Sequence, residues 1–270
     1  MQRLATALVL LPALWLLIKR APGWAFFVFT LGMITVGCWE VYRMLQARGQ
    51  RPFQWLGLLA ACLLLWSSVA VRPAFEAGLA LVALTFLAFV LAMATRPGPE
   101  QMLEAVSSTL FPVLLVGLPL GYLTALRYMP GEDGPDLLML LFICVAAADT
   151  CAYYVGKSLG RRPLAPRLSP KKTWEGAVAG LAGSVAAAWV AQAWFYQRLG
   201  LRHALLLGLI LGAAGILGDL AESVVKRASG VKDASGLLPG HGGVIDRTDS
   251  LLFSGPILYY YYVTFLQAGS

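Results

Sequence analysis

Long apolar runs, separated by short clusters of charged, glycine and proline residues, cover most of the chain. A membrane-spanning helix needs about 20 consecutive apolar residues, and most of these runs are of that length. The pattern predicts an all-α, polytopic integral membrane protein with about nine transmembrane helices. The expected helices cover residues 4–18, 24–42, 53–71, 75–94, 107–126, 136–156, 174–196, 203–225 and 250–267.

The first run is short and has a second interpretation, a secretory signal peptide. Residues 1–3 would be its charged start and residues 4–18 its apolar segment. A signal peptide ends in small residues at a cleavage site. Here Lys19 and Arg20 follow instead, and another apolar run begins at once. We therefore expect a retained helix, with a hairpin to the next run as one arrangement; whether these first two helices cross fully stays open.

Composition agrees with a membrane protein and excludes other classes. Hydrophobic residues make up 59% of the 270 residues and charged residues 13%, and the mean hydropathy is +0.71. Soluble domains are about half apolar and about a quarter charged. The low charge excludes a disordered chain. The four cysteines lie in apolar runs without CxxC spacing, which favours small buried hydrophobes over a metal site or a disulfide framework.

The basic residues predict the orientation in the membrane. Fifteen of the 21 Lys and Arg residues fall at the N-terminus and in the loops after the second, fourth, sixth and eighth helices. The positive-inside rule places these loops in the cytoplasm. The N-terminus is then cytoplasmic, and nine crossings leave the C-terminus outside. The net charge of +7 thus reflects topology and attraction to anionic lipids, and no soluble basic domain exists to bind nucleic acid.

The polar residues concentrate in the second half of the chain. The two longest cytoplasmic loops, 157–173 and 226–249, hold ten of the fifteen inward-facing basic residues. We treat residues 1–270 as a single membrane domain in which 1–135 supplies mainly apolar helices. Residues 136–270 form the half that carries the chemistry.

Four acidic residues lie within or at the ends of the expected helices of that half: Asp149, Glu175, Asp219 and Glu222. A carboxylate within a membrane span costs about 2.5–3.5 kcal/mol and is by default a functional candidate. Asp219, Glu222 and Ser223 share one helix face. The preceding glycines, residues 208, 212, 215 and 218, allow close approach of another backbone. The alternative is that these acids only neutralise the neighbouring basic residues.

Residues 223–249 combine basic residues, glycines and carboxylates. The basic residues Lys226, Arg227 and Lys232 can meet phosphates. The glycines at 236, 240, 242 and 243 permit a loop whose amides cradle an anion. Asp246 and Asp249 are three residues apart at the start of the last helix, and with Asp219 they could hold Mg²⁺. Such a cluster is typical of phosphoryl or nucleotidyl transfer. The alternatives are a helix cap for Asp249 and a turn role for His241.

A second basic loop leads into the expected helix 174–196. Ser169 and Pro170, followed by Lys171, Lys172 and Thr173, are interpreted as the start of this helix, with Glu175 and Gly176 in its first turn. Helix N-terminal amides together with two lysines form an anion site. The alternative is a loop that only sets topology. Asp149 lies on the preceding expected helix, four residues before Tyr153. We expect it to face the same cytoplasmic half of the protein as this loop.

These residues carry a resemblance to a known family. The stretch S-x-x-K-R-x4-K-D-x-[GSA]-x2-L-P-x-H-G-G-x-x-D-R-x-D, at residues 223–249, resembles the signature of phosphatidate cytidylyltransferases, also called CDP-diacylglycerol synthases. The stretch S-P-[KR]-K-[ST]-x-E-G at residues 169–176 also fits that family. The match covers residues 149–249, and the first half is similar only as a set of apolar helices.

The resemblance implies a bacterial inner-membrane enzyme that uses CTP, phosphatidic acid and a divalent cation, Mg²⁺, to release pyrophosphate and CDP-diacylglycerol. It implies that Asp219 and Asp246 bind the metal with Asp249 beside them, and that Lys226 and Arg227 meet phosphates. The nucleotide site would draw on both loops, at Ser169, Lys171, Lys172, Thr173, Glu175, Ser223, Lys232, His241, Gly242 and Gly243.

Three other functions fit parts of the pattern. A transporter or channel would use Asp149, Asp219 and Glu222 as a cation path. It predicts charges spread along a path through the bilayer, whereas the charges of this chain crowd into the expected cytoplasmic third. A non-catalytic scaffold leaves the carboxylate set unexplained. A related enzyme would load CTP onto a different lipid phosphate. The oligomeric state stays open, with a homodimer as one option.

Overall fold

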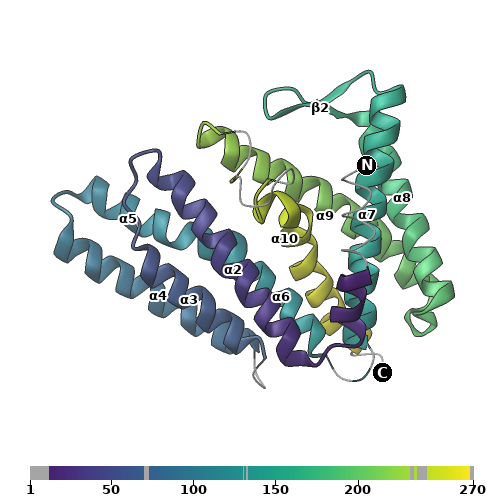
Figure 1. The fold of residues 1–270 in the computed structure, drawn as a ribbon, viewed down its shortest axis with the longest axis horizontal. Coiled ribbons are helices and arrows are strands. Elements are labelled where there is room, and N and C mark those ends of the chain that lie inside the picture. Colours follow the sequence, from purple (N-terminus) through teal and green to yellow (C-terminus); the bar gives the residue numbers. More distant parts are fainter. Residues whose placement is uncertain are drawn as a thin grey trace.

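A computed structural model of the chain describes residues 12–69, 73–129, 131, 133–231, 234–235 and 242–267. Helices dominate it (Figure 1), which confirms the expected all-α membrane fold. Residues 12–19 are helical. The remaining α-helices are α2 Gly23–Gln46, α3 Gln54–Ser67, α4 Pro73–Thr95, α5 Pro99–Pro112, α6 Leu118–Arg127, α7 Asp133–Leu159, α8 Trp174–Trp194, α9 Leu201–Ala228 and α10 Ile245–Tyr261.

Six of the described helical segments are long and apolar enough to cross a membrane. The segment Pro99–Arg127 is one of them, and it contains a π-helical turn, Val113–Gly117, between α5 and α6. Pro112 and Pro119 lack a backbone N–H, so the regular hydrogen-bond ladder is disturbed there, which is where wider turns arise. α3 has 14 residues, and α10 has 17 before it continues as the π turn Tyr262–Leu266. The total of nine spans stays a prediction, because six described segments meet the length and apolarity of a span, α3 and α10 are shorter, and residues 1–11 lie outside the described part.

α10 lies between two groups of helices. It packs against α9 on one side and α6 on the other, while α7, α8 and α9 pack side by side. Figure 1 shows α2 to α5 on the left, α7 and α8 on the right, and α6, α9 and α10 in the middle. Because α10 carries Asp246 and Asp249, this arrangement places both acids where the two groups of helices meet.

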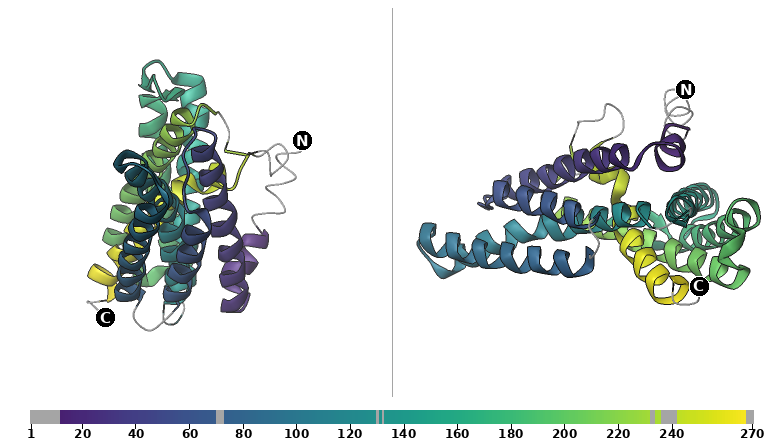
Figure 2. Two further views of the ribbon diagram at one scale, coloured as in Figure 1. Left: turned by 90° about the vertical axis from the view of Figure 1, so that its left-hand side faces the viewer. Right: turned by 90° about the horizontal axis from the view of Figure 1, so that it is seen from below.

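The loops separate into two ends of the molecule, as charge counting predicts. At one end, Arg48 Nε donates to the Ala228 carbonyl, Arg96 to the Arg51 carbonyl and Arg227 to the Leu168 carbonyl. These bonds join the loops that follow α2, α4, α7 and α9. At the other end Arg127 donates to the Ala21 carbonyl, and Arg198 pairs with Asp133 and Asp136. Figure 2 shows the helices running between these two ends.

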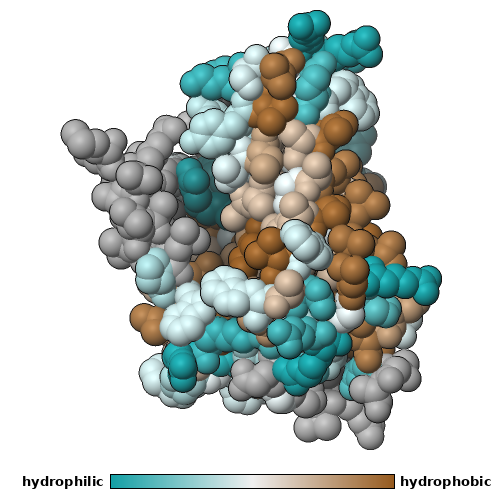
Figure 3. All heavy atoms as spheres, turned by 90° about the vertical axis from the view of Figure 1, so that its right-hand side faces the viewer, coloured by the Kyte–Doolittle hydropathy of each residue, from teal (hydrophilic) through white to brown (hydrophobic). Residues whose placement is uncertain are grey.

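Exposed apolar side chains form a band between the two polar ends. On the face made by α8 and α9, Figure 3 shows apolar residues across the middle and polar residues above and below. The band includes Val178, Val190, Leu205, Leu209 and Leu217, which are all exposed. Such a surface suits lipid and not water. The four cysteines are free; Cys38 and Cys144 are buried and the other two half-buried, in line with a role as small hydrophobes.

One small β-hairpin interrupts the helical fold and corrects a prediction. Pro163–Ala165 (β1) pairs antiparallel with Ser169–Thr173 (β2), with Pro163 opposite Thr173. The stretch expected to begin a helix is therefore an extended strand, and α8 begins at Trp174. Pro170 has no N–H to donate, and the Thr173 side chain accepts the Gly176 amide at 3.2 Å as the N-cap of α8. Glu175 and Gly176 do lie in the first turn of α8, as predicted.

Candidate active site

Three carboxylates from two helices meet beside the end of α9. Asp219 and Glu222 are on α9 and Asp249 is on α10, and each offers an oxygen within 4.8 Å of the others. Gly218 makes this approach possible, because a Cβ at that position would overlap the carbonyl of Asp249 and lie 3.2 Å from the Cα of Ser250. The prediction that the glycines of this helix admit another backbone is confirmed here, and also at Gly208, which contacts α8. Three oxygen donors in one space are a group that can hold a divalent cation.

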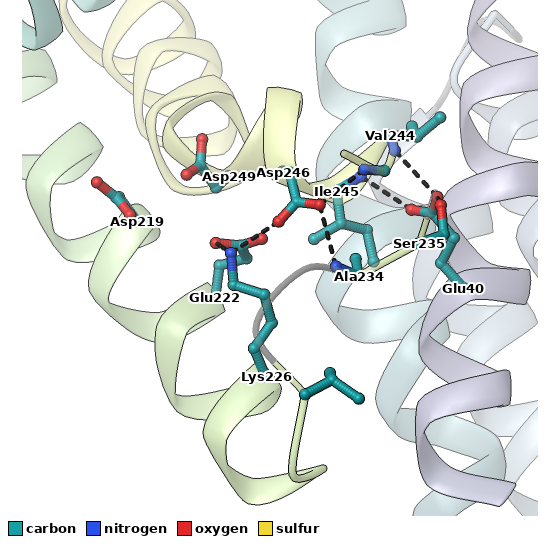
Figure 4. Close-up of polar contacts among 12 residues, drawn as sticks. Glu40, Asp219, Glu222, Lys226, Ala234, Ser235, Val244, Ile245, Asp246 and Asp249 are labelled. Carbon is teal, nitrogen blue, oxygen red and sulfur yellow. Dashed lines mark hydrogen bonds and ion pairs between the residues drawn. The ribbon is translucent and has the colours of Figure 1, made fainter. Parts of the chain in front are cut away.

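Lys226 divides this cluster from Asp246. Its ammonium group lies 2.7 Å from Glu222 Oε2 and 2.7 Å from Asp246 Oδ1. The other Asp246 oxygen accepts the amides of Gly243 at 2.7 Å and Ala234 at 3.0 Å. Figure 4 shows Glu222 and Asp246 facing Lys226, with Asp219 and Asp249 beyond Glu222. The structure thus brings Asp219 together with Asp249. Asp246, which the resemblance pairs with Asp219 as a metal ligand, bonds to Lys226 and to two backbone amides instead.

These donors also govern the protonation of Asp246, which precedes the apolar run 250–267. Burial raises the pKa of its carboxyl, but the hydrogen bonds from the Lys226 ammonium and from the two backbone amides outweigh burial and hold the pKa below its ordinary value. Asp246 is therefore ionised at neutral pH.

A cavity of about 640 Å³ opens beside the carboxylates. Its lining includes Asp149 of α7, Lys171, Lys172 and Thr173 of β2, and Asp219 of α9. The ammonium group of Lys172 forms an ion pair with Asp219. The predicted basic stretch therefore does face the carboxylates, although it does so from a strand. Asp149 lies at the same end of the molecule as Asp219, as expected.

Other predicted residues bond to backbone groups of the loops. Glu175 accepts the backbone amides of Arg161 and Arg162, at 3.1 and 3.3 Å, and so ties the start of the hairpin to α8. Arg227 donates to the carbonyls of Leu168 and Val231. Ser169 begins β2, at the far end of that strand from α8. Lys232 and His241, like Asp233 and Pro239 of the signature, lie outside the described residues.

The structure places two glycines and a serine of the signature next to the carboxylates. Gly242 has φ of +75°, where other residues are strained, and a Cβ on it would lie 2.6 Å from Asp246 Oδ2. Gly243 offers its amide to the same carboxylate. Ser223 is buried on α9, one residue after Glu222.

One acidic residue of the site is missed by the sequence analysis. Glu40 of α2 is fully buried and accepts the amides of Val244 and Ile245 at the start of α10. A signal is present in the sequence, because a lone acid inside the apolar run 24–42 is costly unless it has a partner. Its partner could not be read from the sequence, since it lies about 200 residues away.

Comparison with known proteins gives a consistent result. A model of the family described as "Cytidylyltransferase family" matches residues 1–265. A phosphatidate cytidylyltransferase from Pseudomonas aeruginosa is 39% identical over 264 residues, covering 95% of this chain and 94% of the relative. One from Synechocystis is 34% identical over 276 residues and 90% of each chain. A similar protein from Escherichia coli, YnbB, is described as uncharacterized and is 36% identical over 60% of this chain and 55% of its own length.

Proposed function

The chain belongs to the cytidylyltransferase family, and from this premise we propose that it transfers the cytidylyl group of CTP to phosphatidate. The products are CDP-diacylglycerol and pyrophosphate. The relatives that span nearly the whole chain carry the name of this activity. The observation that carries the proposal is the carboxylate cluster of Asp219, Glu222 and Asp249, beside a cavity that Lys171 and Lys172 line.

The chemistry of the donor set fits a divalent cation. Asp219, Glu222 and Asp249 supply carboxylate oxygens, which Mg²⁺ prefers. Glu222 Oε1 is buried and has no hydrogen-bond partner among the described residues, so one donor atom is free for a ligand. A divalent cation held by these carboxylates would supply Lewis-acid stabilisation of the negative charge that develops on the phosphates. Asp246, which the family signature assigns to the metal, would join this set by exchanging its bond to Lys226.

The lysines bind and orient the phosphates. Lys171 and Lys172 line the cavity and would meet the triphosphate of CTP. Lys226, which pairs with Asp246, would stabilise the charge that develops on the α-phosphate. An oxygen of the phosphatidate phosphate attacks the α-phosphorus in line and forms a new P–O bond. The bond from that phosphorus to the oxygen bridging to the β-phosphate breaks, and pyrophosphate leaves with the electron pair. Because the lipid phosphate is already an anion, no side chain has to remove a proton.

The proposed reaction also fits the expected orientation. CTP is cytosolic, so the end that carries the hairpin and the carboxylates faces the cytoplasm of a bacterial inner membrane. Phosphatidate reaches the site from the bilayer. The N-terminus is then cytoplasmic and, with nine crossings, the C-terminus is outside. A homodimer is compatible with this arrangement, and its formation does not enter the mechanism.

The test is pyrophosphate release from CTP by purified protein in detergent or lipid. We expect release that requires both Mg²⁺ and phosphatidate, with labelled CTP entering the lipid fraction. Competition between phosphatidate and lipid phosphates of different backbone identifies the acceptor. Folded protein that releases no pyrophosphate would contradict the proposal, and a transporter would then be the better explanation of the acidic residues.

A further inference from the structure

Glu40 is an acidic residue in the first half of the chain, far in sequence from the carboxylate cluster. It lies on α2, between apolar neighbours, and its side chain is 0% exposed. A buried carboxylate in a membrane protein needs partners that compensate for its charge. The nature of those partners therefore indicates what Glu40 is for.

Both oxygens of Glu40 accept hydrogen bonds from the start of α10. Oε1 accepts the amide of Val244 and Oε2 that of Ile245, each at 3.1 Å. Val244 is the N-cap residue of α10 and Ile245 its first helical residue. The first amides of a helix have no partner within it and carry partial positive charge. Glu40 thus caps α10 from a different helix.

The loop ahead of α10 is shaped around two carboxylates. The hydroxyl of Ser235 donates to Glu40 Oε1, and a Cβ on Gly243 would lie within 2.5–2.8 Å of the Glu40 carboxyl atoms. The backbone at Gly243 also contacts the second carboxylate, because its amide donates a hydrogen bond to Asp246. Figure 4 shows Glu40 and Asp246 on opposite sides of this stretch. Moving Glu40 therefore moves the backbone that holds Asp246.

α2 is itself held firmly, so Glu40 has a fixed position. The Tyr42 hydroxyl donates to the Thr109 carbonyl at 2.7 Å, and Cys38 Sγ lies 3.5 Å from the Pro112 carbonyl. Both bonds are buried and tie α2 to α5. Glu40 transmits this fixed position to the first turns of α10, which present Asp246 and Asp249.

We propose that Glu40 is a positioning residue that fixes the N-terminus of α10, and through it the carboxylates that bind the metal. The inference rests on the proposed function, because it assigns Asp246 and Asp249 to that chemistry. It gives the first half of the chain a direct part in the active site. Residues that orient metal ligands from outside typically contribute about 10- to 100-fold to metal affinity or activity.

The charge of Glu40 matters as well as its shape. Each carboxyl oxygen faces a backbone N–H, so a glutamine at this position turns its own NH₂ group toward one of them in either orientation. Glu40→Gln therefore leaves one amide of α10 without an acceptor at almost unchanged volume. Glu40→Asp keeps the charge but retreats by one methylene, so it keeps part of the capping interaction.

The experiment compares Glu40→Gln with Tyr42→Phe, which removes a buried hydrogen bond between the same helix and α5 and leaves the Glu40 carboxylate unchanged. Hydrogen–deuterium exchange of the peptide covering residues 243–249 reports the cap directly. Titration with Mn²⁺, followed by its electron paramagnetic resonance signal, reports the metal site. In Glu40→Gln we expect faster exchange of that peptide, about 10- to 100-fold weaker Mn²⁺ binding and a comparable fall in kcat. Tyr42→Phe removes one of the two buried bonds between α2 and α5 but keeps the Glu40 carboxylate, so it should change all three values much less than Glu40→Gln does. Glu40→Asp should fall between the wild type and Glu40→Gln.

Two results would overturn the inference. One is unchanged exchange and Mn²⁺ affinity in folded Glu40→Gln. The other is an equal change in Tyr42→Phe, which would reduce Glu40 to a general stabiliser of α2. If Glu40→Gln does not fold, Glu40→Asp supplies the same comparison. Exchange and Mn²⁺ binding need no turnover, so a wild type without cytidylyl transfer would reject the proposed function and still test the role of Glu40.

Discussion

At the scale of single residues, Lys226 decides how the carboxylates of the site are divided. Its ammonium group lies between Glu222 and Asp246, at 2.7 Å from an oxygen of each. Lys226 therefore pairs both with Glu222, a member of the carboxylate cluster, and with Asp246, which lies beside the cluster. Lys172 pairs in the same way with Asp219. Both lysines belong to stretches that are predicted to bind phosphate, so the site holds its cations next to its carboxylates before any substrate arrives. Among the described side chains, Asp249 is the acid of this cluster that forms no ion pair with Lys172 or Lys226.

The two acids beside Lys226 can be told apart by their effect on the metal. We expect Glu222→Gln to weaken Mn²⁺ binding by about 10-fold or more, because Glu222 carries the buried oxygen without a hydrogen bond. Asp246→Asn should lower kcat with a smaller change in affinity, because its oxygens are engaged by Lys226 and two amides. Mn²⁺ titration and the Mg²⁺ dependence of pyrophosphate release measure both. Full Mg²⁺-dependent activity in Asp246→Asn would exclude Asp246 from the metal site.

At the scale of elements, the contact between α9 and α10 sets the spacing of the carboxylates. In Gly218→Ala the new Cβ would overlap the Asp249 carbonyl. We expect a loss of stability of about 1–3 kcal/mol from overpacking, together with a large loss of activity because Asp249 moves away from Asp219. Gly215→Ala is the matched control, since its Cβ would meet Ser250 at an ordinary 3.5 Å. It should be neutral or gain up to about 1 kcal/mol in helix propensity. Thermal unfolding in detergent and kcat measure the pair, and equal behaviour of the two variants would contradict this explanation.

The junction between the hairpin and α8 makes a separate prediction. Thr173 ends β2 and caps α8, so Thr173→Ala should cost about 1 kcal/mol of stability. It should also raise the KM for CTP, because the strand that carries Lys171 and Lys172 loses its attachment. Thr173→Ser keeps the capping oxygen and should restore most of the KM. A KM in Thr173→Ser that stays as high as in Thr173→Ala would show that the methyl group, and not the cap, is what matters.

The elements also show which features a sequence can predict. Asp219 and Glu222 are predicted on one helix face because their spacing is local, and glycines before them indicate close packing. The hairpin is missed because a strand of five residues depends on its partner, Pro163–Ala165, and not on its own pattern. The bond between Lys226 and Asp246 and the cap by Glu40 are missed for the same reason. They depend on how α2, α9 and α10 pack, which hydrophobic periodicity does not specify.

At the scale of the whole molecule, charge counting and structure agree on which loops share an end, and the remaining question is which membrane face that end occupies. α8 joins the two ends directly. Its 21 residues rise about 31 Å at 1.5 Å each, close to the ~30 Å apolar thickness of a bilayer. Arg167 in the hairpin precedes α8, and Gln197 follows it, so the two residues lie near opposite ends of this helix. Both residues are exposed.

Single cysteines at these two positions, in a chain whose four natural cysteines are replaced by alanine, test this orientation. We expect Arg167→Cys to react with a membrane-impermeant maleimide in inside-out vesicles and Gln197→Cys in right-side-out vesicles. This result would follow because the positive-inside rule assigns the hairpin to the cytoplasm. The reverse pattern would place the carboxylates on the membrane face that CTP does not reach. That result would contradict the proposed reaction. Labelling of both cysteines from one side would mean that α8 does not cross the bilayer, and the count of nine spans would fall with it.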